Sequence, residues 1–93
     1  MHHFKIAVTP IASKRLELIQ TMESLLQFYR PFCEDINLKE SQRMIFITGT
    51  VKDMQQLKKI TDSKEFEVFN GALSILAIKT EFNIVGNREL KKN

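Results

Sequence analysis

The architecture of this protein is set by an opening segment that reads Phe4-Lys5-Ile6-Ala7-Val8-Thr9-Pro10. Its apolar residues recur at every second position, which is the period of a β-strand, and Pro10 ends the strand because proline has no N–H to donate. The next stretch, from Ala12 to about Tyr29, contains neither Gly nor Pro. Its apolar residues recur every three or four positions, which predicts one face of a long helix that Pro31 stops. The face comprises Leu16, Ile19, Met22, Leu26 and Tyr29, widened by Leu18 and Leu25 so that two sides of the helix are expected to be covered.

Two further strands are predicted after this helix. Apolar and polar residues alternate from Cys33 to Lys39, and the short polar segment Glu40-Ser41-Gln42 then forms a turn. The stretch from Arg43 to Val51 is nearly continuously apolar at residues 44–47 and is rich in β-branched residues. Such a composition is typical of a strand that is covered on both faces.

Two capped helices and a last strand complete the pattern. Asp53 is a good N-cap for a second helix, whose thin apolar face comprises Met54, Leu57 and Ile60. Ser63 can cap a third helix, whose apolar face comprises Phe66, Phe69, Asn70, Leu73 and Leu76. Apolar residues alternate again from Ala77 to Val85, and Gly86-Asn87 ends this strand.

The predicted order of elements is therefore β-α-β-β-α(α)-β. This is the split βαβ, ferredoxin-like arrangement of the α+β class, in which four antiparallel strands bury one face under the helices. The other face also needs a cover, and the two-sided apolar character of residues 44–47 indicates that it meets a second copy of the sheet. We therefore expect a homodimer formed through the open sheet face.

Length and composition limit the possible classes of protein. The chain has 93 residues, 43% hydrophobic and 27% charged, which are ordinary values for one globular domain covering residues 1–93. No apolar run is long enough to span a bilayer, and the start lacks the apolar region of a signal peptide. The single cysteine, Cys33, excludes an internal disulfide, so we expect a cytoplasmic protein without a membrane partner. The net charge of +3 is concentrated in a polar C-terminal tail at residues 86–93, which does not indicate nucleic-acid binding.

Several short strings occur in an order and spacing that one protein family shares. They are Ile6-Ala7-Val8-Thr9-Pro10, Cys33 at the start of the second strand, Leu57 four residues before Thr61, Ser63-Lys64-Glu65-Phe66 followed by Gly71-Ala72-Leu73, and Phe82-Asn83-Ile84-Val85 before Glu89-Leu90. Across residues 4–90 the chain resembles the antibiotic-biosynthesis monooxygenase family, a group of dimeric α/β-barrel proteins. The resemblance implies that fold, a homodimer, and cofactor-independent oxygenation of a small aromatic or quinol-type substrate.

The resemblance does not carry the catalytic residues of the family into this chain. Many members have a Trp at the end of the third strand, where this sequence has Val51 and contains no Trp anywhere. Members that degrade haem use an Asn, a Trp and a His ligand at positions that are occupied here by Phe4, Ile60 and Asn70. We therefore expect neither haem oxygenation nor any other bound cofactor, and fold alone does not fix function.

Asn70 is the polar residue of greatest interest, because it lies within the apolar face of the third helix. If that face is buried, its amide needs a hydrogen-bond partner. The partner could be a backbone group, or Asn70 could be a polar anchor in an aromatic pocket between helix and sheet. In cofactor-free oxygenation the substrate anion itself reduces oxygen, so the protein needs only to bind it, orient it and stabilise negative charge. An Asn amide could stabilise that charge but could not act as the base.

The remaining candidate residues have both a structural and a functional interpretation. Tyr29 could be an amphipathic core residue with its hydroxyl in water, or it could hydrogen-bond a phenolic substrate at a pocket mouth. His2 shares a strand face with Phe4 but lies next to the frayed end of the chain. The spacing of the two histidines gives no metal site. The aromatic residues could line a pocket for a planar ligand or simply form the core; they are Phe4, Phe28, Phe46, Phe66 and Phe69.

These observations leave an enzyme and two non-enzymatic alternatives. The leading hypothesis is a cofactor-independent monooxygenase-like protein acting on a small aromatic or quinol-type ligand. The alternatives are a non-catalytic ligand-binding or sensing module and a purely structural homodimer of the same fold. RNA binding is disfavoured, because the third strand lacks the paired exposed aromatics that RNA-binding domains with this element order use for base stacking.

Overall fold

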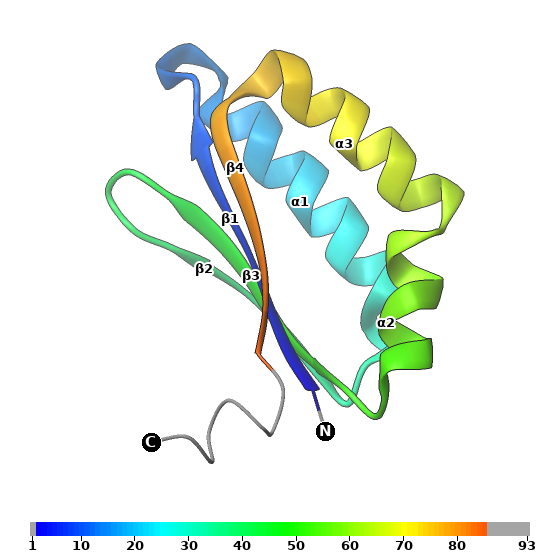
Figure 1. The fold of residues 1–93 in the computed structure, drawn as a ribbon. Helices are drawn as coiled ribbons and strands as arrows, with labels where there is room; N and C mark the ends of the chain where they lie inside the picture. Colours follow the sequence, from blue (N-terminus) through cyan, green and yellow to red (C-terminus); the bar gives the residue numbers. More distant parts are fainter. Residues whose placement is uncertain (1, 86–93) are drawn as a thin grey trace.

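The structure, a computed structural model, describes residues 2–85 and has the predicted α+β order of elements (Figure 1). The strands are β1 (His2–Pro10), β2 (Asp35–Glu40), β3 (Ile45–Val51) and β4 (Ala77–Val85). The helices are α1 (Arg15–Tyr29), α2 (Met54–Thr61) and α3 (Lys64–Leu76), with short 3-10 turns at Ala12–Lys14 and Arg30–Phe32. The predicted end of the last strand at Gly86-Asn87, the polar tail at 86–93 and the string Glu89-Leu90 lie outside the described residues.

The four strands form one antiparallel sheet in the order β2-β3-β1-β4. Ile6 at the centre of β1 lies opposite Ile47 of β3 and Phe82 of β4, so these three side chains share one face. Helices α1, α2 and α3 all lie on that face of the sheet, and no helix of the described chain lies on the other (Figure 1). This is the ferredoxin-like arrangement that the sequence predicts.

The core lies between this sheet face and the helices. Its fully buried side chains include Val8 of β1, Ile45 and Val51 of β3, and Leu18 and Met22 of α1. The alternation predicted for the strands is confirmed, because every second residue of β3 from Ile45 to Val51 is buried. The residues between them are half-buried on the open face, so within one chain this strand is covered on one face only.

The predicted apolar face of the first helix is wrong at one position. Leu16 is 65% exposed, whereas Leu18 is fully buried. At 3.6 residues per turn, Leu16 lies about 160° around the helix axis from Leu18 and therefore points away from the sheet. Met54 at the start of α2 is also exposed, although Leu57 and Ile60 of its predicted face are buried.

Both predicted helix caps are confirmed. The Asp53 carboxylate accepts a hydrogen bond from the Gln56 backbone N–H at 3.0 Å, and the Ser63 hydroxyl accepts one from the Phe66 backbone N–H at 3.1 Å. Each bond satisfies a backbone donor that the first turn of a helix leaves without a partner. No helix in residues 2–85 has the length and hydropathy needed to cross a membrane.

Candidate functional site

The predicted aromatic residues between helix and sheet form a packed cluster. Phe4 stacks on Phe82 with 6.2 Å between ring centroids, and Phe82 makes an edge contact of 5.7 Å with Phe66. Phe66 in turn lies 6.0 Å from Phe69, and all but the half-buried Phe82 are buried. The structure therefore brings together Phe4, Phe66 and Phe69, but their rings pack on one another rather than around a space.

Gly49 on β3 shows how closely this cluster is packed. A Cβ atom at Gly49 would lie 2.5 Å from the Phe4 ring, a distance that real Cβ contacts do not reach. The pair is adjacent across the sheet, because Phe4 lies directly opposite Gly49. The absence of a side chain at position 49 therefore leaves the space that the Phe4 ring occupies.

Asn70 is exposed, so the expectation of a buried amide is wrong. The buried residues of α3 are Phe66, Phe69, Leu73 and Leu76. At 3.6 residues per turn, Asn70 lies about 80° from the centre of the arc that they occupy. Its side chain lines a shallow cavity of about 380 Å³ between α3 and the start of β4, away from the aromatic cluster.

Tyr29 is buried, with only 2% of its surface exposed, and its hydroxyl does not lie in water. The hydroxyl donates a hydrogen bond to the Ile60 carbonyl oxygen at 3.1 Å and contacts the Ser63 hydroxyl. Burial, and secondly the charge of the nearby Glu65 carboxylate, raises the pKa of Tyr29 to about 12. Tyr29 therefore ties the end of α1 to the junction between α2 and α3.

The remaining predicted residues lie elsewhere. His2 is half-buried at the start of β1, on the same face as Phe4. Phe46 lies on the open face of the sheet, where the Lys5 ammonium is 4.4 Å from the centre of its ring. The structure thus separates His2, Tyr29, Phe46 and Asn70 from one another instead of converging them on one site.

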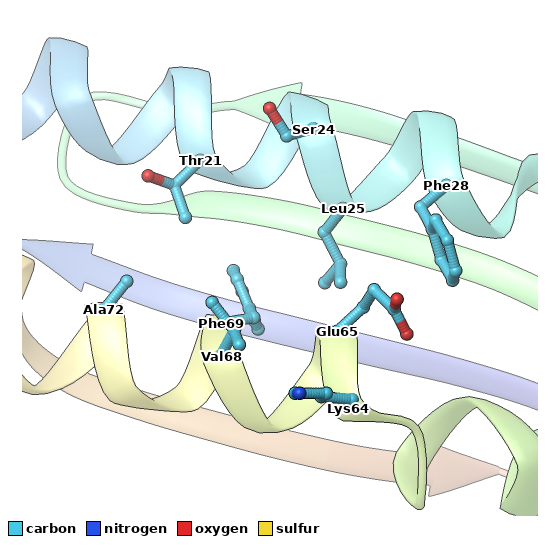
Figure 2. A pocket seen from close by; sticks show the side chains of 9 residues that line it. All are labelled: Thr21, Ser24, Leu25, Phe28, Lys64, Glu65, Val68, Phe69 and Ala72. Atoms are coloured by element: carbon cyan, nitrogen blue, oxygen red, sulfur yellow. The ribbon is translucent and has the colours of Figure 1, made fainter.

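A groove lies between α1 and α3 (Figure 2). It measures about 610 Å³, within the range of small-molecule sites. Its walls are mainly apolar, with hydroxyl groups on α1 and one lysine and one glutamate on α3. The lining residues are Thr21, Ser24, Leu25, Phe28, Lys64, Glu65, Val68, Phe69 and Ala72.

Sequence reasoning identified Phe28 and Phe69 among these groove residues, as aromatic surface suited to a planar ligand. Exposed apolar side chains on the two helices are a further signal for the groove. Phe28 and Val68 are large apolar residues that fall outside the buried faces of α1 and α3, and they are 44% and 64% exposed. Side chains of this type outside the core become informative when two helices bring them to the same groove.

A second, smaller cavity of about 260 Å³ lies beside the groove. Phe28 and Glu65 line both cavities, and the second adds Tyr29, Phe32, Lys59, Ile60 and Ser63. The rings of Phe28 and Tyr29 meet edge-on at 5.0 Å, and Phe32 lies 6.3 Å from Phe28. Part of the lining of the second cavity is therefore aromatic.

The described residues give little support to metal or thiol chemistry. Within residues 2–85, no three or more His, Cys, Asp or Glu side chains lie close enough together to hold a metal ion. Burial, and secondly the charge of Asp35, raises the pKa of the Cys33 thiol. A raised pKa lowers the thiolate fraction at neutral pH, which is the opposite of what a nucleophilic cysteine needs.

Comparisons with known proteins place this fold among those of one group of structures. No protein-family model matches the sequence, and no curated protein matches it. A candidate antibiotic biosynthesis monooxygenase from Deinococcus radiodurans has a TM-score of 0.87 at 14% identity, over 92% of this chain and 91% of its own. A protein from Mycobacterium tuberculosis has a TM-score of 0.85 at 12% identity, covering 91% and 92%. A candidate antibiotic biosynthesis monooxygenase from Nitrosomonas europaea has 0.81 at 10%, covering 94% and 98%.

The chain therefore has the α+β ferredoxin-like fold of antibiotic biosynthesis monooxygenase structures over nearly its whole length. The resemblance in fold that the sequence strings imply is confirmed. At identities of 10–14% the likeness establishes the fold and not the chemistry.

Proposed function

We propose that this protein is a cofactor-independent monooxygenase-like enzyme that binds a small aromatic or quinol-type compound in the groove between α1 and α3. The observation that carries the proposal is the groove itself, a mainly apolar site of about 610 Å³ with a few polar groups on its walls. A concave apolar site with a small number of polar groups is the usual form of a small-molecule site. The reaction class is proposed by analogy with the candidate monooxygenases whose fold the chain shares.

The groove offers the groups that such a reaction needs. Glu65 is the one carboxylate among its lining residues, and it can accept the proton of a phenolic hydroxyl bound beside Phe28. The protonated Glu65 carboxyl can then donate a hydrogen bond back to the resulting anion. The apolar walls exclude water from the ring, and the electron-rich anion itself reduces oxygen. In this proposal the aromatic cluster around Phe4 is a structural core, and the groove replaces it as the site.

Oxygen consumption with quinols, naphthols and anthrone-like compounds tests this function. We expect a raised melting temperature with a bound compound, followed by oxygen uptake that depends on the protein. Glu65→Gln keeps the size of the side chain but removes the base, so we expect uptake to fall while binding persists. Glu67→Gln, on the same helix but not among the groove-lining residues, is the matched control. Uptake that is equal in the wild type and Glu65→Gln would exclude Glu65 as the base.

A second candidate is favoured by the packing of the aromatic cluster. Because Phe4, Phe66 and Phe82 fill the region between α3 and the sheet, the protein could be a non-catalytic ligand-binding module or a structural homodimer. Binding without oxygen uptake would favour the binding module. If none of these compounds raises the melting temperature of the protein, the structural dimer would be favoured.

We also propose that the protein forms a homodimer through the open face of the sheet. All helices of the described chain lie on the opposite face (Figure 1). On the open face, Phe46, Thr48 and Thr50 of β3 are half-buried within one chain, and a second sheet would complete their cover. Such face-to-face packing of two small sheets supplies apolar burial that a chain of 93 residues otherwise lacks.

Light scattering at micromolar concentration tests the dimer. We expect twice the chain mass of 10.8 kDa for the wild type and a monomer for Phe46→Glu, because that substitution places a charge at the centre of the proposed interface. Leu16→Glu changes an exposed apolar residue of α1 on the helical side and should leave the dimer intact. A wild-type mass of one chain would refute the proposal.

A further inference from the structure

We propose that Phe28 is a specificity-determining residue, a movable aromatic partition that sets the length of the ligand in the groove between α1 and α3. This inference rests on the proposed function and names the class of substrate: a compact fused-ring compound with a hydroxyl group at one end. The proposal rests on the observation that Phe28 and Glu65 line both the large groove and the smaller cavity beyond it.

The position of the partition follows from the two helices. In Figure 2 the Phe28 ring extends from α1 toward α3, and the Glu65 side chain extends toward it from the first turn of α3. Ala72 lines the groove two helical turns further along α3. Seven residues at 1.5 Å each separate Glu65 from Ala72, so the groove is about 10 Å long on this side of the partition. That length suits a compact fused-ring compound.

Phe28 differs from its aromatic neighbours in its freedom to move. Tyr29 is buried and held by its hydrogen bond to the Ile60 carbonyl oxygen. The Phe28 ring is 44% exposed and rests on the Tyr29 ring by an edge contact. A ring with this exposure can change rotamer without opening the core, whereas the Tyr29 wall behind it stays fixed. Removal of the Phe28 ring would join the groove to the cavity of about 260 Å³ beyond it.

The charges at the partition indicate which end of the ligand lies there. Glu65 is the acidic residue common to both cavities, and Lys64 and Lys59 line one cavity each. In Figure 2 the Lys64 ammonium points away from the Glu65 carboxylate along α3. A hydroxyl group that donates to Glu65 is therefore the polar group that fits beside Phe28, and the fused rings extend along Leu25 toward Ala72.

The test compares ligands of different length in matched variants. Binding of 2-naphthol and of the longer 2-anthrol is measured by calorimetry for the wild type, Phe28→Ala and Phe32→Ala. Phe32 lines the second cavity but not the groove, so Phe32→Ala is the control for the loss of an exposed ring. We expect the wild type to prefer naphthol. In Phe28→Ala the preference should shift toward anthrol by at least about tenfold, because the hydroxyl-bearing ring can then move past position 28 into the second cavity, which Glu65 also lines.

Tyr29 gives an independent readout of entry into the second cavity. It is the only tyrosine in a chain without tryptophan, and it lines that cavity. Anthrol should therefore quench the tyrosine fluorescence of Phe28→Ala more than that of the wild type. If the wild type binds naphthol and Phe28→Ala keeps the same preference for naphthol over anthrol, this inference is wrong. The proposed function is then unaffected. If neither compound binds the wild type or Phe28→Ala, the proposed function fails and the inference fails with it.

Discussion

Raising the pH should destabilise this protein through one side chain, Tyr29. Its hydroxyl is buried against the Ile60 carbonyl oxygen, and its pKa is raised to about 12 from the ordinary value of 10.0. Between these two values the unfolded chain has lost the phenolic proton and the folded chain still holds it. The unfolded state therefore binds fewer protons, and the free energy of unfolding falls as the pH rises through this window.

The size of the effect follows from the pKa difference. A difference of about two units corresponds to about 3 kcal/mol, set against a total stability of roughly 5–14 kcal/mol for a chain of this length. Because the folded form favours the neutral tyrosine, the full contribution is present below pH 10 and is lost by about pH 12. Urea denaturation of the wild type across this range should show a falling midpoint.

Tyr29→Phe is the control that isolates this contribution. The variant loses the hydrogen bond to Ile60 at all pH values, at a cost of about 1 kcal/mol, but it should lack the tyrosine-dependent slope. Lysine titration affects both proteins, so the difference between them reports Tyr29 alone. Since the chain has one tyrosine and no tryptophan, tyrosinate absorbance in the near ultraviolet follows the same group directly. An absorbance midpoint near pH 10 in the folded protein, or equal slopes in the two proteins, would refute the reasoning.

Four further substitutions test the packing. Gly49→Ala should lower the free energy of unfolding by about 1–3 kcal/mol in urea denaturation, because the new methyl group meets the Phe4 ring. Phe4→Ala should lower it by about 3–5 kcal/mol, because the missing ring leaves a cavity. Asp53→Ala should cost about 1 kcal/mol by removing the cap of α2; no loss would mean that water replaces the cap. Asn70→Ala should change the melting temperature little, since the side chain is exposed, and a large loss would show a contact that the burial does not predict.

The order of elements, the strand faces and both helix caps could be predicted from the sequence, because each depends on local periodicity or on a single capping residue. Ser63 is an example: its hydroxyl caps the helix that the sequence places after it. The burial of Asn70 and Leu16 could not be predicted in this way. Each lies at one edge of a wide predicted face, and which edge of such a face is covered depends on how the helix packs on the sheet.

The candidate site was harder to predict than the fold. Helix α1 and helix α3 are far apart in sequence, and the groove exists only where their exposed sides meet. Phe28 and Val68 have no periodic relation that would link them before the helices are packed. The aromatic residues that the sequence marks most clearly are those of the core, because large apolar residues at helical or strand spacing are what a core requires.

The hydrogen bonds at Ser63 imply that α2 and the end of α1 unfold together rather than separately. Helix α2 has eight residues, a length at which an isolated helix is unstable in water. Its last turn is held by the Ser63 hydroxyl, which donates to the Ile60 carbonyl oxygen at 2.7 Å, and by Tyr29 of α1, which donates to the same oxygen. Amide protons in α2 should therefore exchange with solvent water only when the end of α1 also detaches, and the two segments should form a single cooperative unit of hydrogen exchange.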